Sequence, residues 1–203
     1  MKMSCRYCPK CGKAHKACIC PLIVSLSSEI ELIILQHPTE VSRPLGTARI
    51  LQLSLPDAHC FTGEDFTRHP QLNQLLSEPD TRHYVLYPGE GAISVNDVPA
   101  PQQKTRVILI DGTWKKAYKM WQLSENLHGL PRLSLPEELK GNYQIRKAPR
   151  EGCLSTVEAG YHLLSVWQPA QDFSPLLSCF EQMIQFQMSH MSPDVRRRYP
   201  SSS

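Results

Sequence analysis

Four cysteines near the start of the chain have the spacing of a metal site. Cys8 and Cys11 form a CxxC pair, and Cys18 and Cys20 form a CxC pair shortly after it. Four thiolates spaced in this way can converge tetrahedrally on Zn²⁺. A closed site of this kind leaves no coordination position for a substrate, so we predict a structural zinc ion. Cys5 is a further candidate ligand.

The cysteines also allow a less favoured interpretation, a reactive or disulfide-bonded tail. The start of the chain has no apolar stretch typical of a secretory signal, which argues against disulfides. Lysines between the cysteines are expected to lower the pKa of the thiols: Lys10, Lys13 and Lys16. The remaining cysteines are scattered and are expected to be inert buried thiols: Cys60, Cys153 and Cys179.

A second candidate site is the tetrapeptide DGTW, formed by Asp111, Gly112, Thr113 and Trp114. It follows the most apolar run of the chain, and in open α/β sheets ligands bind beyond the carboxyl ends of strands. Gly112 permits a tight turn and a close backbone approach. The helix expected after it offers free N–H groups to an anion, and Thr113 can cap that helix. Asp111 is either a functional carboxylate or a residue that caps the helix and orients its neighbours.

Other loops combine small and polar residues next to predicted element ends. They read QHPTE (36–40), GTA (46–48), YPGEG (87–91), RKAPR (146–150) and EGCLSTVEAG (151–160). Glu40 and Glu158 are weaker candidates for a polar role. Neither GxGxxG nor GxxxxGK[ST] occurs, which weighs against a Rossmann dinucleotide site and a P-loop.

The elements that must position these residues alternate between short apolar runs and amphipathic stretches. This pattern predicts an α/β fold with a mostly parallel sheet flanked by helices. We expect strands at 31–36, 84–87, 106–110 and 142–147, and helices at 47–53, 70–77, 114–125, 155–167 and 175–191. The sequence from Ser155 to Glu158 fits a capping box. Trp114, Tyr118 and Trp121 recur at helical spacing and are predicted to face the core.

Length and composition bound the organisation of the chain. Its 203 residues, 41% hydrophobic and 20% charged, are typical of a folded globular protein. We predict a cysteine-rich segment (1–28), one large domain (29–195) and a flexible tail (196–203). No apolar run approaches the ~20 residues of a membrane-spanning helix, so a cytoplasmic protein is expected.

Positive charge is concentrated in two regions of a nearly neutral chain. The net charge is +3, yet residues 1–20 carry five bases and no acid, and residues 101–150 carry ten bases and four acids. Such clusters favour local contact with a polyanion. The alternative is an ordinary solvated surface. Lys115 and Lys119 lie one turn apart on the predicted helix and are expected to be free to meet phosphate.

The segments named above, in this order along the chain, resemble those of the DTW-domain family. The resemblance covers the cysteine cluster, QHPxE, GTA, YPG, DGTW and STVEA, and so nearly the whole chain. It is strongest to bacterial tRNA-uridine aminocarboxypropyltransferases. It implies a SPOUT-like fold with a knotted carboxyl-terminal half, and transfer of the 3-amino-3-carboxypropyl group of S-adenosylmethionine to N3 of a variable-loop uridine in tRNA, with release of methylthioadenosine.

On this resemblance each candidate residue receives an expected role. The catalytic residues are Asp111, Thr113 and Trp114, with Asp111 as the general base for the N3 proton and Trp114 as a wall of the site. The residues expected to bind the donor are Tyr87, Pro88, Gly89, Gly112, Ser155, Thr156 and Glu158. The residues expected to contact tRNA phosphates are Lys115, Lys116, Lys119, Arg146, Lys147 and Arg150. Two alternatives are an RNA methyltransferase with the same donor and a non-catalytic, zinc-bearing RNA-binding protein.

Overall fold

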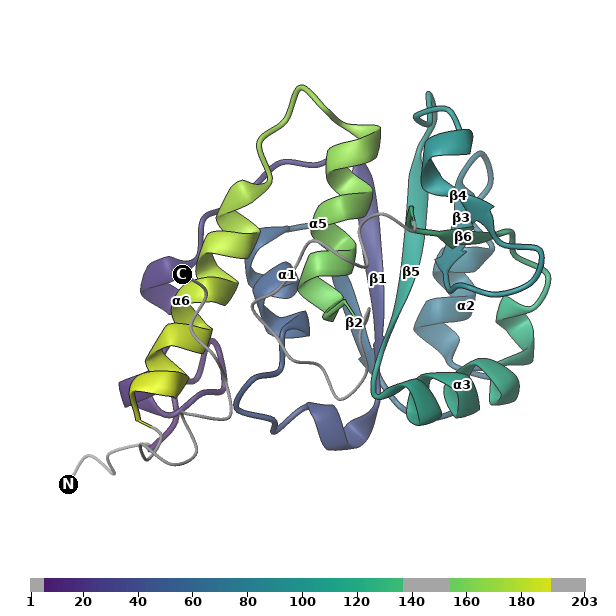
Figure 1. Ribbon diagram of the computed structural model, residues 1–203. Helices are drawn as coiled ribbons and strands as arrows, with labels where there is room; N and C mark the ends of the chain where they lie inside the picture. The colour runs from purple at the N-terminus through teal and green to yellow at the C-terminus, as the bar shows by residue number, and fades with distance from the viewer. Residues whose placement is uncertain (1–5, 137–153, 191–203) are drawn as a thin grey trace.

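The computed structural model describes residues 6–136 and 154–190, and its centre is a parallel β-sheet (Figure 1). The strands are β1 (Ile30–Gln36), β2 (His59–Thr62), β3 (Arg82–Leu86), β4 (Ile93–Ser94), β5 (Thr105–Asp111) and β6 (Arg132–Ser134). They form a six-stranded sheet in the order β2-β1-β5-β3-β6-β4. Every neighbouring pair of these strands is parallel, so all their carboxyl ends lie at one edge.

Helices cover both faces of the sheet. They are α1 (Ala48–Ser54), α2 (Pro70–Leu76), α3 (Trp114–Leu123), α5 (Thr156–Trp167) and α6 (Ser174–Ser189). In Figure 1, α1, α5 and α6 lie on one side of the central strands β1 and β5, and α2 and α3 lie on the other. The predicted α/β fold with a parallel sheet and flanking helices is therefore confirmed.

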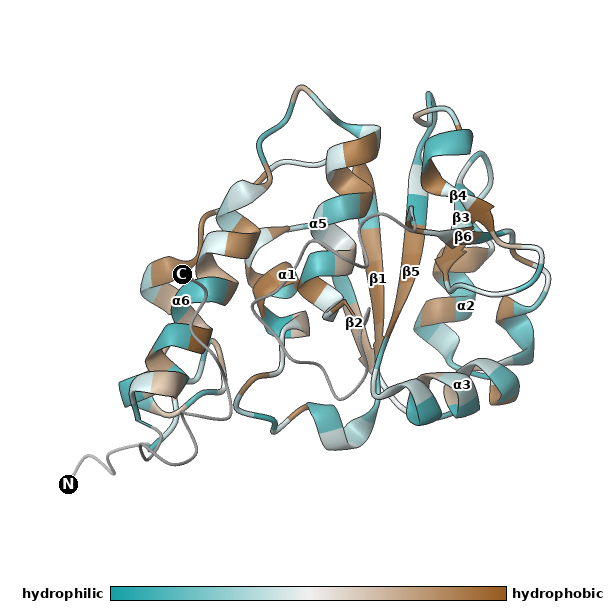
Figure 2. Cartoon of the chain, viewed as in Figure 1, coloured by the Kyte–Doolittle hydropathy of each residue, from teal (hydrophilic) through white to brown (hydrophobic). Residues whose placement is uncertain are grey.

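The two central strands are buried on both faces, which explains their uninterrupted apolar sequences. Leu32 and Ile34 of β1 join a hydrophobic cluster with α1, α5 and α6. Ile33 and Leu35, which point to the other face, join a second cluster with α2 and α3. Figure 2 shows both strands as the apolar centre of the fold.

Most predicted elements are present within one to three residues of the expected bounds. Three strands were not predicted: β2, β4 and β6 have four, two and three residues and are too short to show a pattern in the sequence. The helix predicted to reach residue 125 ends at Leu123 and is followed by a short 3-10 helix, Glu125–Leu127. The strand predicted at 142–147 lies outside the described residues.

The prediction that an aromatic stripe of α3 faces the core is wrong for two of its three residues. Trp114 is 49% exposed and Tyr118 is 58% exposed. The helix instead packs on the sheet through Ala117 and Met120, and only Trp121 of the aromatic residues lies partly buried against the core. Small and flexible side chains let α3 lie close to β5, and this rotates the aromatic residues outward.

The cysteine-rich segment packs on the same core as the sheet. Cys11 and Ile19 are 3% and 1% exposed and belong to the cluster that contains α1, α5 and α6. Among the residues that the structure describes, no helix combines the length and apolar character needed to span a membrane. The knot was expected in the carboxyl-terminal half, where residues 137–153 and 191–203 lie outside the described part.

Candidate functional site

The carboxyl ends of β1 and β5 form a switch point of the sheet. The two strands are neighbours, and Gln36 at the end of β1 is paired in register with Asp111 at the end of β5. The chain then leaves β1 toward α1 on one face and leaves β5 toward α3 on the other (Figure 1). Ligands of open α/β sheets bind where adjacent strands diverge in this way.

Asp111 is held at this point by two side chains distant in sequence. Its side chain is buried, with 7% of the residue exposed. Gln36 Nε2 donates a hydrogen bond to Asp111 Oδ2 at 2.8 Å, and the hydroxyl of Thr156 donates to Oδ1. A carboxylate has about four acceptor positions, so these two contacts leave room for a further donor. Asp111 therefore orients Thr156, as the structural alternative expected, and can still act on a ligand.

The helix α5 begins beside Asp111 with a complete capping box. Ser155 accepts from the Glu158 backbone N–H, and the Glu158 carboxylate accepts from the Ser155 backbone N–H at 2.5 Å. Both residues are buried. The predicted capping box is confirmed, and it fixes the helix start that carries Thr156. The positive end of this twelve-residue helix favours a negative charge at Asp111 or on a bound group.

The turn from β5 into α3 leaves little room for a side chain. A Cβ atom at Gly112 would lie 3.2 Å from Lys116 Cβ and 3.7 Å from His37 Cβ. Gly112 thus permits the close approach expected of it, here between neighbouring segments of the protein. Thr113 occupies the N-cap position of α3, but its hydroxyl makes no capping hydrogen bond.

Two of the three lysines of α3 are engaged by carboxylates. Lys116 Nζ lies 2.9 Å from Glu40 Oε1 and also contacts Thr39. Lys119 pairs with Glu64, which lowers the pKa of the Glu64 carboxyl. The expectation that Lys119 is free is therefore wrong. Lys115 is exposed and makes no ion pair with any residue of the described part.

The loop after β3 is fixed by an aromatic stack. Tyr87 packs on Trp121 with ring centroids 5.3 Å apart, and the guanidinium of Arg132 lies 5.5 Å from the Trp121 ring. Burial raises the pKa of the Tyr87 hydroxyl. Gly89 has a φ of 140°, a conformation that favours glycine. Pro88 and Gly89 are exposed at the same sheet edge as Asp111, because β3 is the other neighbour of β5.

The structure thus gathers part of the predicted site. Asp111, Gly112 and Thr156 lie together, with Ser155 and Glu158 directly behind them in the capping box. Tyr87, Pro88 and Gly89 follow the adjacent strand, and Trp114 lies at the exposed start of α3. Three residues expected to bind RNA, and one candidate zinc ligand, lie outside the described residues: Arg146, Lys147, Arg150 and Cys5.

Three residues at this edge had no predicted role: Gln36, His37 and Glu64. Gln36 contacts Asp111 directly, and the backbone N–H of His37 donates to the Asp111 carbonyl at 2.9 Å. His37 Nε2 lies 3.0 Å from Glu64 Oε1. The other carboxylate oxygen of Glu64 pairs with Lys119. Gln36 and His37 lie in the QHPTE loop that the sequence singles out, and Gln36 closes β1 as Asp111 closes β5. Glu64 follows a strand too short to be recognised.

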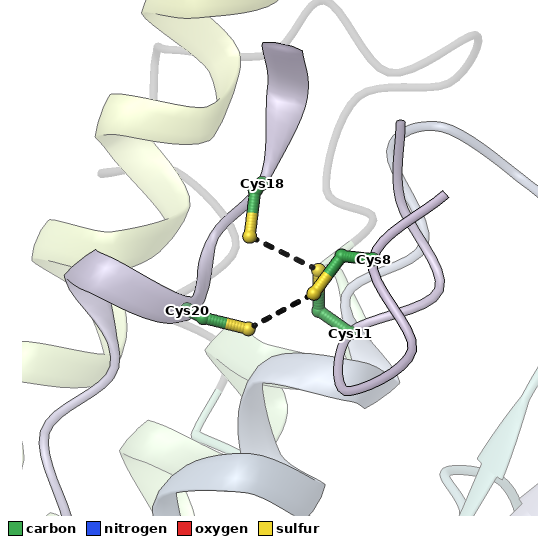
Figure 3. A group of neighbouring side chains, drawn as sticks. All are labelled: Cys8, Cys11, Cys18 and Cys20. Carbon is green, nitrogen blue, oxygen red and sulfur yellow. Dashed lines mark hydrogen bonds between the residues drawn. The ribbon is translucent and has the colours of Figure 1, made fainter. Parts of the chain in front are cut away.

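The four cysteines gather into the cluster that their spacing predicts (Figure 3). Their sulfur atoms all lie within 4.8 Å of one another, with Cys8 and Cys20 3.6 Å apart and Cys11 and Cys18 3.7 Å apart. Zn–S bonds of about 2.3 Å imply tetrahedral edges of about 3.8 Å. The donor set and its geometry therefore fit a metal ion.

Backbone groups, rather than lysine side chains, favour a thiolate in this cluster. The pKa of Cys8 is lowered to about 6 because the backbone N–H groups of Cys11 and Lys10 point at its sulfur. Burial and the neighbouring thiols raise the pKa of Cys20 to about 12. Gly12, with a φ of 72°, closes the turn and donates its N–H to the Cys8 carbonyl at 2.8 Å.

A buried lysine joins the cysteine segment to the loop before α1. Lys13 is 9% exposed, and its Nζ donates to the Pro44 carbonyl at 2.6 Å and to the Gly46 carbonyl at 3.4 Å. Burial lowers the pKa of this ammonium group. The cysteine segment thus positions the loop that follows Gln36 and His37.

The scattered cysteines have the character expected of structural thiols. Cys179 is 1% exposed, and burial raises its pKa to about 11. Cys60 is partly exposed, and burial likewise raises its pKa to about 11. Cys153 lies outside the described residues.

Fold and site together define a class of protein. Parallel strands covered on both faces, with a polar cluster at the diverging ends of neighbouring strands, are typical of α/β proteins that bind a ligand at the sheet edge. The cysteine cluster, which could hold a metal ion, adds a second feature. The sequence matches the DTW domain over residues 5–188, and the chain belongs to the DTW domain family.

Curated relatives carry a common name. The chain is 36% identical over 168 residues to tRNA-uridine aminocarboxypropyltransferase 2 of Drosophila melanogaster. The aligned region covers 78% of the chain and 65% of the fly protein. It is 29% identical over 192 residues to the protein of that name from Macaca fascicularis, covering 90% and 64%. A plant relative, tRNA-uridine aminocarboxypropyltransferase A of Arabidopsis thaliana, is 24% identical over 220 residues, covering 93% and 83%. The chain thus spans slightly less than two thirds of the animal relatives.

Proposed function

We propose that this chain is a tRNA-uridine aminocarboxypropyltransferase of the bacterial group that its sequence resembles. It transfers the 3-amino-3-carboxypropyl group of S-adenosylmethionine to N3 of a variable-loop uridine and releases methylthioadenosine. The names of the relatives support the reaction and the tRNA substrate. The proposal includes a cytoplasmic location, domain limits at residues 28 and 195, and a SPOUT-like, knotted carboxyl-terminal half.

One observation carries this proposal, the placement of Asp111. Its carboxylate is buried at the switch point of the sheet and is fixed by Gln36 and Thr156. Two acceptor positions are left to meet the N3–H group of a uracil ring. Because N3 is protonated at neutral pH, a fixed carboxylate beside it serves as the general base, a contribution of about 10²–10⁴ in rate.

The reaction itself is a substitution at carbon. The N3 lone pair attacks the γ-methylene of the methionyl arm, the bond from that carbon to sulfur breaks, and its electrons stay on sulfur as methylthioadenosine leaves. The N3 proton passes to Asp111. The pose of the donor decides the product, since attack on the methyl group would give methylation instead.

The residues around Asp111 are proposed to fix that pose. Backbone N–H groups at Gly112 and at the start of α5 are suited to bind the donor carboxylate. Thr156 lies at that helix start, and the Ser155–Glu158 capping box holds the helix in place. Tyr87, Pro88 and Gly89 are proposed to line the donor site from the neighbouring loop, with Thr113 and Trp114 beside the reacting centre.

Zinc is proposed as the metal of the cysteine cluster, in a structural role. Cys8, Cys11, Cys18 and Cys20 would hold it with all four coordination positions filled, so the ion contributes to folding and not to the reaction. Cys5 is a further candidate ligand.

Incubation of purified protein with unmodified tRNA and S-adenosylmethionine tests the function. We expect methylthioadenosine in solution and an aminocarboxypropyl adduct on one uridine, detected by nucleoside mass spectrometry. A strain that lacks the protein should lose the modified uridine, and wild type should restore it. A methyl adduct would show that the chain is a methyltransferase. Binding of tRNA without any adduct would show a non-catalytic RNA-binding protein.

The basic residues of α3 and of the 146–150 segment are proposed to contact tRNA phosphates: Lys115, Lys116, Lys119, Arg146, Lys147 and Arg150. We expect the double replacement of Lys115 and Lys119 by Ala to weaken tRNA binding and to flatten its salt dependence by about 0.7–0.9 per lost contact. Lys115 should account for most of this change, because Lys119 is already paired with Glu64. Binding measured at several salt concentrations gives the slope.

Lys104 provides the control for this measurement. It lies at the opposite edge of the sheet, immediately before β5, and pairs with Glu31 and Glu78. Lys104→Ala is expected to leave the salt slope unchanged. Equal slopes for wild type and the Lys115/Lys119 variant would assign these lysines to the solvated surface.

A further inference from the structure

A large cavity lies between the cysteine segment, the loop after β1, α1 and α6. It has a volume of about 540 Å³, which is within the usual range for small-molecule and nucleotide sites. Gln36 lines it, and the same side chain donates a hydrogen bond to Asp111. The cavity therefore reaches the candidate site from the side opposite the loop after β3.

Positive charge dominates the lining of this cavity. Among the described residues that line it, Glu40 is the only acidic one, against four basic residues: Lys13, Lys16, Arg43 and Arg49. Glu40 is already paired with Lys116 and Arg43. Even with the charge of about −2 that a zinc ion with four thiolates carries, the sum stays positive. The cavity is suited to an anion.

Two of these cations are available to a ligand. Arg49 lies on α1 and makes no ion pair within the described part of the chain. Lys16 is exposed and is likewise unpaired there. The ammonium group of Lys13, by contrast, already donates hydrogen bonds to the carbonyls of Pro44 and Gly46. Arg49 and Lys16 thus remain to bind a phosphate group.

The other lining groups suit a nucleobase. Tyr7 and Phe186 offer aromatic rings from the cysteine segment and from α6, and Tyr7 is 53% exposed. Aromatic side chains hold unstacked RNA bases by stacking. The remaining polar lining includes amide side chains, which can pair with base edges: Gln36, Gln52, Gln182 and Gln187.

We propose that this cavity binds one flipped-out nucleotide of the tRNA, with its phosphate toward Arg49 and Lys16 and its base toward Phe186. The inference rests on the proposed function, since it assigns the RNA substrate of that site to a pocket. S-adenosylmethionine carries a net positive charge and is disfavoured by the same lining. Donor and nucleotide thus approach Asp111 from different sides.

The first test measures the charge contribution. We expect the Arg49→Ala/Lys16→Ala variant to bind unmodified tRNA at least tenfold more weakly, with a salt slope reduced by about 0.7–0.9 per lost contact. Its affinity for S-adenosylmethionine should be unchanged in calorimetry. The control is Arg82→Ala, an exposed arginine at the start of β3 on the opposite edge, which should bind both ligands as wild type does.

The second test measures stacking. Phe186→Ala should weaken tRNA binding about 5- to 150-fold, the range of a lost base–aromatic stack, without altering the salt slope. Zinc content and the thermal midpoint confirm that each variant is folded. Loss of S-adenosylmethionine binding with intact tRNA binding would make the cavity the donor pocket and overturn the inference, while the proposed function would stand.

The remaining outcomes also separate the two proposals. Wild-type affinity of both variants for tRNA would overturn the inference. If the wild-type protein forms no methylthioadenosine, the proposed function fails, yet the binding measurements, made without the donor, still decide whether the cavity holds RNA.

Discussion

Asp111→Asn is expected to lower kcat for aminocarboxypropyl transfer by about 10²–10⁴. The amide has nearly the shape of the carboxylate but cannot accept the N3 proton. Gln36 and the Thr156 hydroxyl can reorient to hold it, so the fold and the binding of both substrates should persist. Single-turnover measurements of methylthioadenosine release give the rate of transfer, and separate binding measurements give the affinities for tRNA and S-adenosylmethionine.

Thr156→Val separates the role of the carboxylate from its positioning. This variant removes one hydrogen bond to Asp111 and keeps the general base. We expect a smaller loss of kcat than for Asp111→Asn, with tRNA affinity preserved. If Asp111→Asn retained wild-type kcat, Asp111 would only be a structural residue that orients Thr156 at the start of α5, and the proton would leave N3 by another route.

Cys11→Ser should cause the largest loss of stability. Cys11 is 3% exposed, belongs to the main hydrophobic cluster and lies 3.7 Å from Cys18. Structural zinc contributes about 10–16 kcal/mol of binding energy in small zinc-finger peptides, so losing one thiolate should remove several kcal/mol. A loss of about 4 kcal/mol would lower the thermal midpoint by about 8–16 °C. Metal analysis and thermal unfolding are the measurements.

Cys60→Ser is the matched control, because Cys60 is a partly buried thiol outside the cluster. It should keep the metal and shift the midpoint far less. Removal of the metal by a strong chelator should reproduce the effect of Cys11→Ser in the wild-type protein. It should also weaken tRNA binding, since Lys13 connects the cysteine segment to Pro44 and Gly46 at the proposed nucleotide cavity. A chelated protein with an unchanged midpoint would exclude a structural metal.

Local sequence was sufficient where local physics decides the structure. The four cysteines lie within a short stretch of chain, so their spacing alone predicts a cluster that the structure contains. The apolar runs of β1 and β5 predict strands that are buried on both faces, as the structure has them. The capping box at Ser155 and Glu158 depends on neighbours three residues apart, and it is present as predicted.

Solvent exposure was harder to predict, because it depends on which face of an element meets the core. Trp114 and Tyr118 have the spacing of a buried stripe, but α3 contacts the sheet through Ala117 and Met120. Lys119 was expected to be free and instead meets Glu64, a residue 55 positions earlier.

The chain by itself determined the class of fold and the clustering of the four cysteines, and it pointed to Asp111 as a candidate site residue. Only the tertiary structure decided what surrounds that carboxylate. Gln36 lies 75 residues before it and Thr156 lies 45 residues after it, and the proposed nucleotide cavity is built from the cysteine segment, α1 and α6 together. The sequence of a strand indicates that the strand is buried but not which strand lies beside it. Parallel pairing depends on how the helices that connect the strands pack on the sheet, and these contacts are distant in sequence.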